Sequence, residues 1–248
     1  MTKRTQRLRN ELLDTTPEIC TERARYFTES MKKTEGSPIV LRRAESFKEV
    51  LENMSLYIRK GELIVGNQAS SPRSAPVFPE YSVEWIEDEL NAEPYYFNER
   101  PNDDFNYTQK TENELREIID YWKGKTVLKN LRNLISDEAK KAWDMGAIDE
   151  GWVSEGGLGN ILPDYELVLE NGLNGYIKKA ENELSKLDLK EPGAAKKKWF
   201  LDSVIKTNKA VISFAHRFAD KLEKLSSEVN DELRKSELLE MAENCRVV

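Results

Sequence analysis

Apolar residues recur at helical spacing along most of this chain. Between Ile39 and Met54 they follow one another at intervals of two, three or four residues, and the longest segment of this kind runs from Phe200 to Leu225. This spacing is typical of helices that bury one face against their neighbours. It predicts helices over residues 3–13, 17–35, 38–54, 83–90, 111–122, 126–135 and 136–145, from residue 163 onward, and over most of the chain after that.

Two of the expected helix starts share a hydroxyl residue followed by proline. Thr16 precedes Pro17, and Ser37 precedes Pro38. Serine and threonine are favoured N-caps, and proline suits the first helical position because the N–H that it lacks would have no partner there. We therefore predict an αα-hairpin, with its first helix capped by Thr16 and ended by Gly36.

Residues 55–68 change to a shorter period. Leu56 and Ile58 alternate with polar neighbours, the pair Lys60-Gly61 is typical of a turn, and a short aliphatic run follows at residues 63–65. Alternation around a turn predicts a β-hairpin, which would be the only sheet.

Two further segments lack any period. Residues 69–82 contain three prolines and are expected to form an ordered loop, and residues 91–109 are expected to cross the surface, held by their aromatic rings. Arg73 in the first segment is a candidate anion ligand, although a surface salt bridge is the commoner role of such a residue.

The densest glycine cluster lies between residues 151 and 159. Glycine tolerates positive φ and close approach of other groups to the backbone. Pro163 and Asp164 then suit the first turn of a helix, because a carboxylate complements the helix dipole. The apolar face of this helix is expected to dock and hold the loop; it consists of Tyr165, Leu167, Val168 and Leu169. A functional loop and a plain tight connection both fit this pattern, and a helix break or close crossing is expected at Gly172 and Gly175.

Composition narrows the class of protein. The chain has 248 residues, of which 39% are hydrophobic and 33% charged, and a formal net charge of −7. An acidic chain lacks the basic excess that non-specific nucleic-acid binding requires. There is no apolar run long enough for a membrane span and no signal-peptide core, so no membrane association and a cytoplasmic location are expected.

The residues offer little chemistry of their own. Cys20 and Cys245 lie at opposite ends of the chain without metal-ligand spacing, and are expected to be small core residues. The single histidine, His216, lies in the long helix near its apolar stripe, and no Ser or Cys nucleophile is presented. The GGLGN stretch lacks the nucleotide-binding glycine patterns. No catalytic residue and no metal ligand is therefore nominated.

Two stretches resemble a known family. GLGNILPDYELVLENGLNG, at residues 157–175, and the segment from TERARYF to SAPVFPE, at residues 21–80, resemble glycyl radical enzymes of the pyruvate formate-lyase superfamily, particularly the glycerol dehydratase-like branch. The resemblance extends to ELLEMAENC near the carboxyl end. It implies a mainly α fold over residues 1–248: a multi-helix amino-terminal scaffold with one small β-hairpin, truncated before most of a ten-stranded α/β barrel, with a possible sub-boundary near residues 91–110.

The same resemblance implies a function. The chain would be the amino-terminal portion of a glycyl radical lyase or dehydratase that acts on a small polar substrate by radical bond cleavage. The sequence has neither the GCxE-like cysteine motif nor the RVAGY-like glycine motif of the family, and Cys20 and Cys245 match neither. The chain would therefore be inactive alone and bind no cofactor itself, and the glycyl radical would lie in the missing part.

One binding residue is carried over by position. Diol-dehydrating members of the family place a histidine where this sequence has Asn160, and that histidine helps to bind a substrate hydroxyl. Asn160 can donate and accept hydrogen bonds but cannot carry a proton at neutral pH. The resemblance therefore makes Asn160 a candidate substrate-binding residue and puts diol dehydration in doubt; a loop-stabilising side chain is the other reading.

The resemblance also implies partners for the protein, and the sequence leaves one alternative function open. The resemblance implies a radical S-adenosylmethionine activating enzyme, a homodimer when the protein is intact, and anaerobic metabolism. The alternative is a stand-alone helical binding or assembly module derived from such an enzyme. An exposed apolar face distinguishes the two, because a domain severed from its barrel leaves one uncovered.

Overall fold

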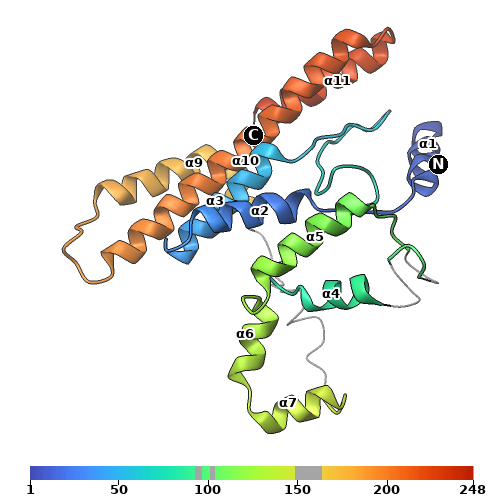
Figure 1. Ribbon diagram of the computed structural model, residues 1–248. Helices are drawn as coiled ribbons and strands as arrows, with labels where there is room; N and C mark the ends of the chain where they lie inside the picture. The colour runs from blue at the N-terminus through green and yellow to red at the C-terminus, as the bar shows by residue number, and fades with distance from the viewer. Residues whose placement is uncertain (93–96, 101–103, 149–163, 248) are drawn as a thin grey trace. The chain divides into compact units, whose positions relative to one another are not determined.

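A computed structural model describes residues 1–92, 97–100, 104–148 and 164–247, and its fold is mainly helical, as predicted (Figure 1). The helices in chain order are α1 (Lys3–Asp14), α2 (Glu22–Lys33), α3 (Ile39–Asn53), α4 (Glu84–Asn91), α5 (Gln109–Trp122), α6 (Val127–Leu134), α7 (Asp137–Asp144), α9 (Tyr165–Ser185), α10 (Ala194–Glu228) and α11 (Glu232–Arg246). Two short strands, β1 (Glu18–Cys20) and β2 (Ser74–Pro76), form a parallel sheet.

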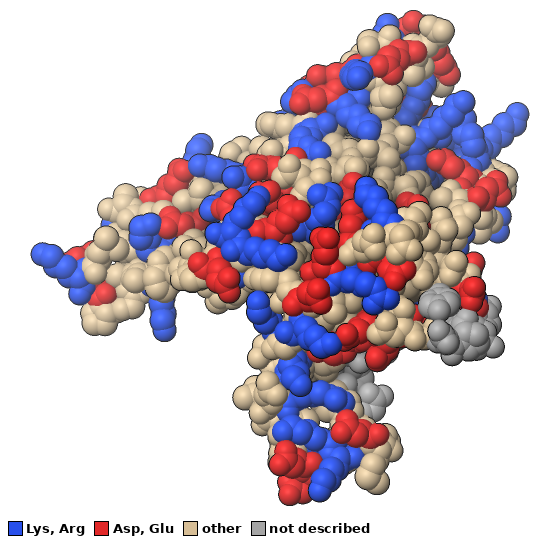
Figure 2. All heavy atoms as spheres, viewed as in Figure 1, with Lys and Arg blue, Asp and Glu red and all other residues tan. Residues whose placement is uncertain are grey.

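The chain divides into two compact units. Unit 1 comprises Met1–Thr15, Tyr26–Pro72 and Asp164–Val248, and unit 2 comprises Thr16–Arg25 and Arg73–Pro163. The expected sub-boundary near residues 91–110 lies inside unit 2. Charged side chains of both signs are interspersed over the face drawn in Figure 2. Within the described residues, no helix is both long and apolar enough to cross a lipid bilayer.

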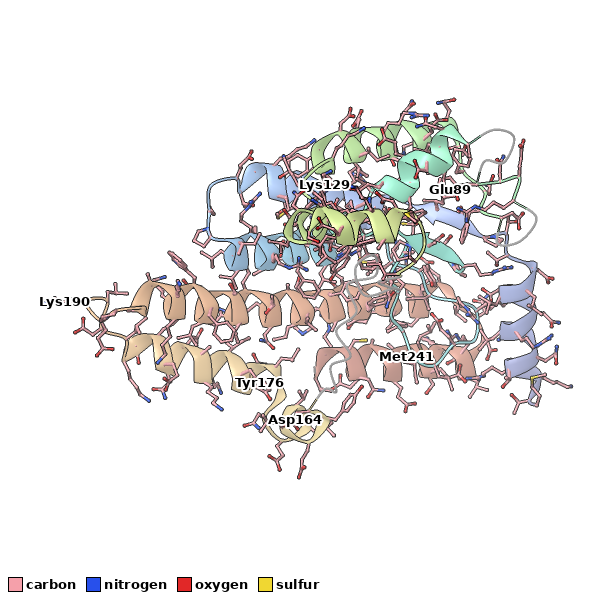
Figure 3. All side chains as sticks on the ribbon, turned by 90° about the horizontal axis from the view of Figure 1, so that it is seen from below. Glu89, Lys129, Asp164, Tyr176, Lys190 and Met241 are labelled. Carbon is pink, nitrogen blue, oxygen red and sulfur yellow. The ribbon has the colours of Figure 1, made fainter. Side chains whose placement is uncertain are left out.

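Unit 1 is built on α10. Helices α3, α9 and α11 all pack against it, and Figures 1 and 3 show α9 and α11 following different halves of its length. Where α10 meets α11, a core cluster brings together five side chains with little solvent exposure: Ala219, Leu222, Leu238, Met241 and Ala242. The long apolar stripe predicted from the sequence is therefore the surface on which this unit assembles.

Cations on α10 hold the carboxyl end of α3. Arg217 donates hydrogen bonds to the carbonyl oxygens of Leu51 and Met54, the latter at 2.7 Å, and Lys221 donates to that of Leu56. The last carbonyls of a helix lack partners within the helix, so these side chains satisfy groups that would otherwise be left unpaired. They also fix the course of the segment that follows α3.

The predicted β-hairpin over residues 55–68 is wrong, because the structure has no strand there. Side chains form hydrogen bonds with the backbone of this segment in place of a strand partner. The backbone N–H of Arg59 donates to Glu62 Oε1 at 2.7 Å, and Asn67 Nδ2 donates to the Ser55 carbonyl at 2.9 Å. Ile58 packs against the core cluster, whereas Ile64 is almost fully exposed. The alternation therefore marked an irregular segment with a few anchored residues.

The predicted helix start at Thr16 is also wrong. Residues 18–20 form β1, which pairs in parallel with β2, and Ile19 N–H donates to the Asn106 carbonyl at 3.3 Å. Asn106 N–H in turn donates to the Pro17 carbonyl at 2.8 Å. These long-range pairings override the local helix signal, and α2 begins only at Glu22.

Helices α5, α6 and α7 of unit 2 lie close to the residue ranges predicted from the sequence. Thr108, Thr126 and Ser136 cap α5, α6 and α7 by accepting a backbone N–H bond on the side-chain oxygen. Phe97 is buried and forms edge-on contacts with the rings of Trp85 and Tyr107, at centroid distances of 6.2 and 5.7 Å. The expected aromatic anchoring of this irregular region is confirmed for these rings.

Candidate functional site

The predicted site lies in a part of the chain that the structure does not describe. Residues 149–163, which include the glycine cluster and Asn160, are outside the described residues. The described segments on either side of these residues are therefore taken one at a time, because each belongs to a different unit.

The carboxyl-side flank is a capped and broken helix. Asp164 Oδ1 accepts a hydrogen bond from Leu167 N–H at 3.0 Å, so Asp164 is the N-cap and the helix begins at Tyr165, slightly later than the predicted start, which had Asp164 in the first turn. The helix breaks at Gly172, whose backbone has φ 61° and ψ 172°, whereas Gly175 stays helical. Figure 3 shows the first part of α9, at Asp164, turned out of line with the part that begins near Tyr176.

The first part of α9 does not dock as predicted. Tyr165 and Leu169 have exposed fractions of 71% and 84%, and Leu167 and Val168 are also exposed. The second part carries the buried Ile177, which lies on the stretch that packs against α10. The break at Gly172 thus separates a docked segment from a leading turn whose apolar side chains face solvent.

The segment that precedes residues 149–163 also exposes large apolar side chains. Met145 and Ile148, which precede residues 149–163, have exposed fractions of 81% and 48%, and Leu134 at the end of α6 reaches 84%. Arg132 holds α7 to α6 through Asp144, at 3.0 Å, and through the face of the Trp143 ring, at 4.5 Å. The described residues on either side of residues 149–163 therefore expose large apolar side chains, each set within its own unit. Exposed apolar patches are typical of interaction surfaces.

A buried ion pair orders unit 2 near its sheet. Glu80, which is 4% exposed, accepts two hydrogen bonds from Arg23, at 2.7 and 3.1 Å. Arg23 also lies over the Phe78 ring at 3.8 Å. Arg73, the candidate anion ligand, is exposed and has a positive φ of 58°, and its carbonyl accepts the Glu18 N–H bond at 3.4 Å. Arg73 directly precedes β2, and the observed role of its backbone is to accept this hydrogen bond from β1.

The histidine and the two cysteines are divided between the two units, with Cys20 in unit 2 and His216 and Cys245 in unit 1. His216 is half-buried on α10, Cys20 is buried in β1, and Cys245 is half-buried against the core cluster of unit 1. Burial raises the pKa of the Cys245 thiol, and nearby Arg246 partly opposes this. In the part of the chain that the structure describes, no group of three or more His, Cys, Asp or Glu side chains is placed to hold a metal ion.

Sequence reasoning missed one hollow in unit 1, which we name the basic cavity. It has a volume of about 750 Å³ and lies between α1, the segment around Gly61 and the start of α11. The side chains that define it carry six positive charges, from Lys3, Arg4, Arg7, Arg59, Lys60 and Arg234. Only folding joins three segments so far apart in sequence, so no local motif could have indicated the cavity.

Comparison with known proteins identifies the family to which the chain is similar over its whole length. A family described as "Pyruvate formate lyase-like" matches residues 1–248. The chain is 33% identical over 232 residues to the probable dehydratase YbiW of Escherichia coli, covering 94% of this chain and 28% of that protein. It is 32% identical over 248 residues to the (2S)-3-sulfopropanediol dehydratase of Klebsiella oxytoca, covering 99% and 30%.

A solved structure agrees with these matches. The glycerol-bound form of the B12-independent glycerol dehydratase from Clostridium butyricum superposes with a TM-score of 0.92 at 36% identity, over 99% of this chain and 31% of that one. The chain thus spans about 30% of the length of the proteins it matches. The resemblance to the amino-terminal part of glycyl radical enzymes, seen in the sequence, is confirmed.

Proposed function

Because this chain belongs to the pyruvate formate lyase-like family, we propose that it is the amino-terminal portion of a glycyl radical lyase or dehydratase that cleaves a bond in a small polar substrate. The observation that carries this proposal is the match over nearly the whole chain to about 30% of the dehydratases' length. A portion of that size supplies scaffold and loops to an enzyme whose reacting groups lie elsewhere.

The exposed apolar flanks support the same proposal. Leu134, Met145 and Leu169 are each more than 80% exposed, and they lie on the two stretches that lead into residues 149–163. Leaving such side chains in water is unfavourable by about 25 cal/mol for each Å² of apolar surface. We assign the contact with the remaining part of the longer protein to these exposed side chains.

Asn160 is the residue of this chain that we assign to substrate binding. Its amide group can donate and accept hydrogen bonds at the same time, which suits a hydroxyl, carboxylate or other small polar group. It cannot transfer a proton at neutral pH, so its role is to orient the substrate. Acid or base chemistry would then fall to groups outside this chain.

The reacting groups and partners belong to the longer protein. A glycyl radical supplies the hydrogen-atom chemistry in such an enzyme, and we place it in the part that this chain does not contain. A radical S-adenosylmethionine activating enzyme, a homodimeric assembly and an anaerobic cytoplasmic setting complete the proposal. The 248-residue chain alone is expected to be inactive.

The mass of the native protein tests this proposal against the stand-alone module. An antibody raised against residues 1–248 would identify the protein in extracts of its anaerobically grown source, and denaturing electrophoresis with mass spectrometry would give its size. A polypeptide about three times longer than this chain is expected, since the chain spans about 30% of its relatives. A polypeptide of this chain's own mass would contradict the single-chain enzyme and favour a binding or assembly module.

A further inference from the structure

The basic cavity of unit 1 is large enough for a small-molecule ligand. Its volume of about 750 Å³ falls within the range of about 300–1,000 Å³ that ligand pockets occupy. Helix α1 forms one wall, residues 58–61 form another, and the end of α10 with the start of α11 closes it. All of these segments belong to unit 1.

The carboxylates of the cavity are already engaged. Glu237 pairs with Arg4 and with Arg234, the latter at 2.9 Å, and these two guanidinium groups hold its pKa below the usual value. Arg234 also donates to the Glu62 carbonyl at 2.8 Å. Asp231 accepts the N–H bonds of Leu233 and Arg234 as the N-cap of α11. Glu237 is thus paired with two guanidinium groups, and Asp231 forms no ion pair with the remaining cations among the described residues.

Three cations in the cavity lack a counter-charge. Across the described ranges, Lys3, Arg7 and Lys60 make no ion pair or side-chain hydrogen bond. The Arg7 guanidinium occupies the space that a Cβ on Gly61 would need, so it lies directly against the backbone of the cavity wall. In a chain with a net charge of −7, this concentration of positive charge is a local exception.

A fourth cation is only partly neutralised. Arg59 donates to the Leu8 carbonyl at 3.1 Å, and its Nε lies 3.9 Å from Glu11 Oε2. That Nε is buried and has no hydrogen-bond partner within the described residues. A buried guanidinium N–H without a partner is unfavourable, and a ligand oxygen would supply the missing acceptor.

The interior of the cavity is apolar. Ile58, Leu225 and Leu238 line it together with Val229 and Leu233. Leu238 belongs to the core cluster, and Ile58 and Leu225 pack against that cluster, so this floor is a rigid part of unit 1. The site therefore combines unpaired cations with a surface that favours an apolar or aromatic group.

We propose that the basic cavity binds a small organic anion that carries two or more negative charges on oxyanion groups joined to an apolar or aromatic body. The guanidinium groups of Arg7 and Arg59 match the geometry of phosphate or carboxylate oxygens. The apolar floor takes the body of the ligand. All the side chains that line this cavity belong to unit 1.

Calorimetric titration of the intact protein that contains residues 1–248 tests the proposal with three probes: adenosine triphosphate, inorganic triphosphate and adenosine. We expect both anions to bind, the nucleotide at least about five times more tightly than triphosphate alone, and adenosine to bind weakly or not at all. Raising the salt concentration should weaken both anions, because exposed charges are screened within about 10 Å at 0.1 M salt.

Charge-reversal variants locate the binding. The double variant Arg7→Glu, Lys60→Glu should weaken nucleotide binding by a factor of about ten or more. The matched control is Lys178→Glu, Lys179→Glu, which reverses two exposed charges on α9 outside the cavity and should change binding by less than about twofold. Arg7→Lys keeps the charge but not the forked donors, so it should weaken binding less than Arg7→Glu alone, and an unchanged circular dichroism spectrum of each variant separates loss of charge from loss of folding.

Other results would overturn the inference. Absence of binding by both anions, or equal losses in the cavity and control variants, would remove the cavity as an anion site. Adenosine binding as tightly as the nucleotide would show that the positive charges play no part. Tight binding of polyglutamate with no binding of the small anions would instead make the cavity a contact for an acidic polypeptide and contradict the proposal.

Discussion

Arg23 and Glu80 form a bidentate ion pair, with Nη2 2.7 Å from Oε1 and Nη1 3.1 Å from Oε2, although they lie 57 positions apart in the chain. Glu80 is buried, and its backbone carbonyl accepts the N–H of Val127 at 3.0 Å. Glu80 therefore links the start of α2, the segment after β2 and the start of α6. Stability of unit 2 should depend strongly on this pair.

Removing one partner of the pair should destabilise unit 2. Breaking a buried ion pair typically costs about 3–5 kcal/mol, because the remaining charge is left buried without compensation, so we expect Glu80→Ala to lower the free energy of unfolding by an amount of that order. Urea unfolding followed by circular dichroism measures the change.

The control for this prediction is an exposed pair in the same unit. Lys123 and Glu87 lie 2.7 Å apart on the surface. Exposed pairs contribute only about 0–1 kcal/mol, so Glu87→Ala should have a small effect. Equal effects of the two substitutions would mean that the Glu80 pair contributes no more than a surface contact.

The contacts of Arg217 with the end of α3 should contribute to the stability of unit 1. Hydrogen bonds from a charged donor contribute about 1.5–3 kcal/mol, and Arg217→Met would leave the carbonyls of Leu51 and Met54 without this partner. We expect a loss of about that size in the free energy of unfolding. Arg246→Met is the control, since Arg246 pairs with Asp220 and Glu223 on the surface, and a similar loss there would contradict the prediction.

How far the sequence predicts the fold depends on the range of each interaction. Capping by Ser136 and the break at Gly172 follow from neighbouring residues, and both were predicted correctly. The strand at residues 18–20 depends on Asn106 and on β2. The course of residues 55–68 depends in part on Lys221, which lies 165 positions after Leu56 and donates to its carbonyl. No local pattern contains that information, so these two segments were predicted wrongly.

The same reasoning applies to the sites. Asn160 was chosen from a resemblance within one continuous motif, and its position stays a prediction because it lies outside the described residues. The basic cavity was missed because Arg7, Lys60 and Arg234 come from three distant segments. The docking of Leu169 was predicted from the apolar face alone, which does not indicate whether the covering surface lies within residues 1–248.

Acid should weaken unit 1 partly through Glu237. Arg4 and Arg234 lower the pKa of Glu237 in the folded protein below the value of 4.5 expected for an unperturbed glutamate. A lowered folded-state pKa contributes stability that is fully present above the unfolded pKa and is lost as the pH falls through the folded pKa. Unfolding measured between pH 7 and pH 3 should therefore lose stability below about pH 4.5, and Glu237→Gln should reduce that loss.

Glu240→Gln is the matched control for this pH dependence. Glu240 is exposed on the same helix and has no ion pair among the described side chains. The control should keep the acid sensitivity of the original chain. An unchanged pH profile in Glu237→Gln would show that its ion pairs do not contribute to acid unfolding.

The exposed flanks should make the 248-residue chain associate with itself. Light scattering and binding of a hydrophobic dye are expected to be high, and the double variant Leu134→Lys, Leu169→Lys should reduce both without lowering the free energy of unfolding, since both side chains are 84% exposed. Ile177→Lys, at a buried position of α9, is the contrasting variant and should destabilise unit 1. A monodisperse chain that binds no dye would favour the stand-alone module.

Substitution of Asn160 should act on substrate binding in the full-length, activated enzyme. We expect Asn160→Ala to raise KM for the substrate and to lower kcat/KM by about tenfold to a hundredfold, the effect of losing one or two hydrogen bonds to a polar ligand. Asn174→Ala, at an exposed position on α9, is the control and should leave both constants nearly unchanged. Steady-state kinetics over a panel of small hydroxylated compounds provides the measurement. Because an amide does not titrate near neutral pH, Asn160→His should add a pH dependence near pH 6.5 that the original enzyme lacks.

If neither substitution changed KM or the pH profile, Asn160 would be a loop-stabilising residue, and the substrate would be bound by residues beyond this chain.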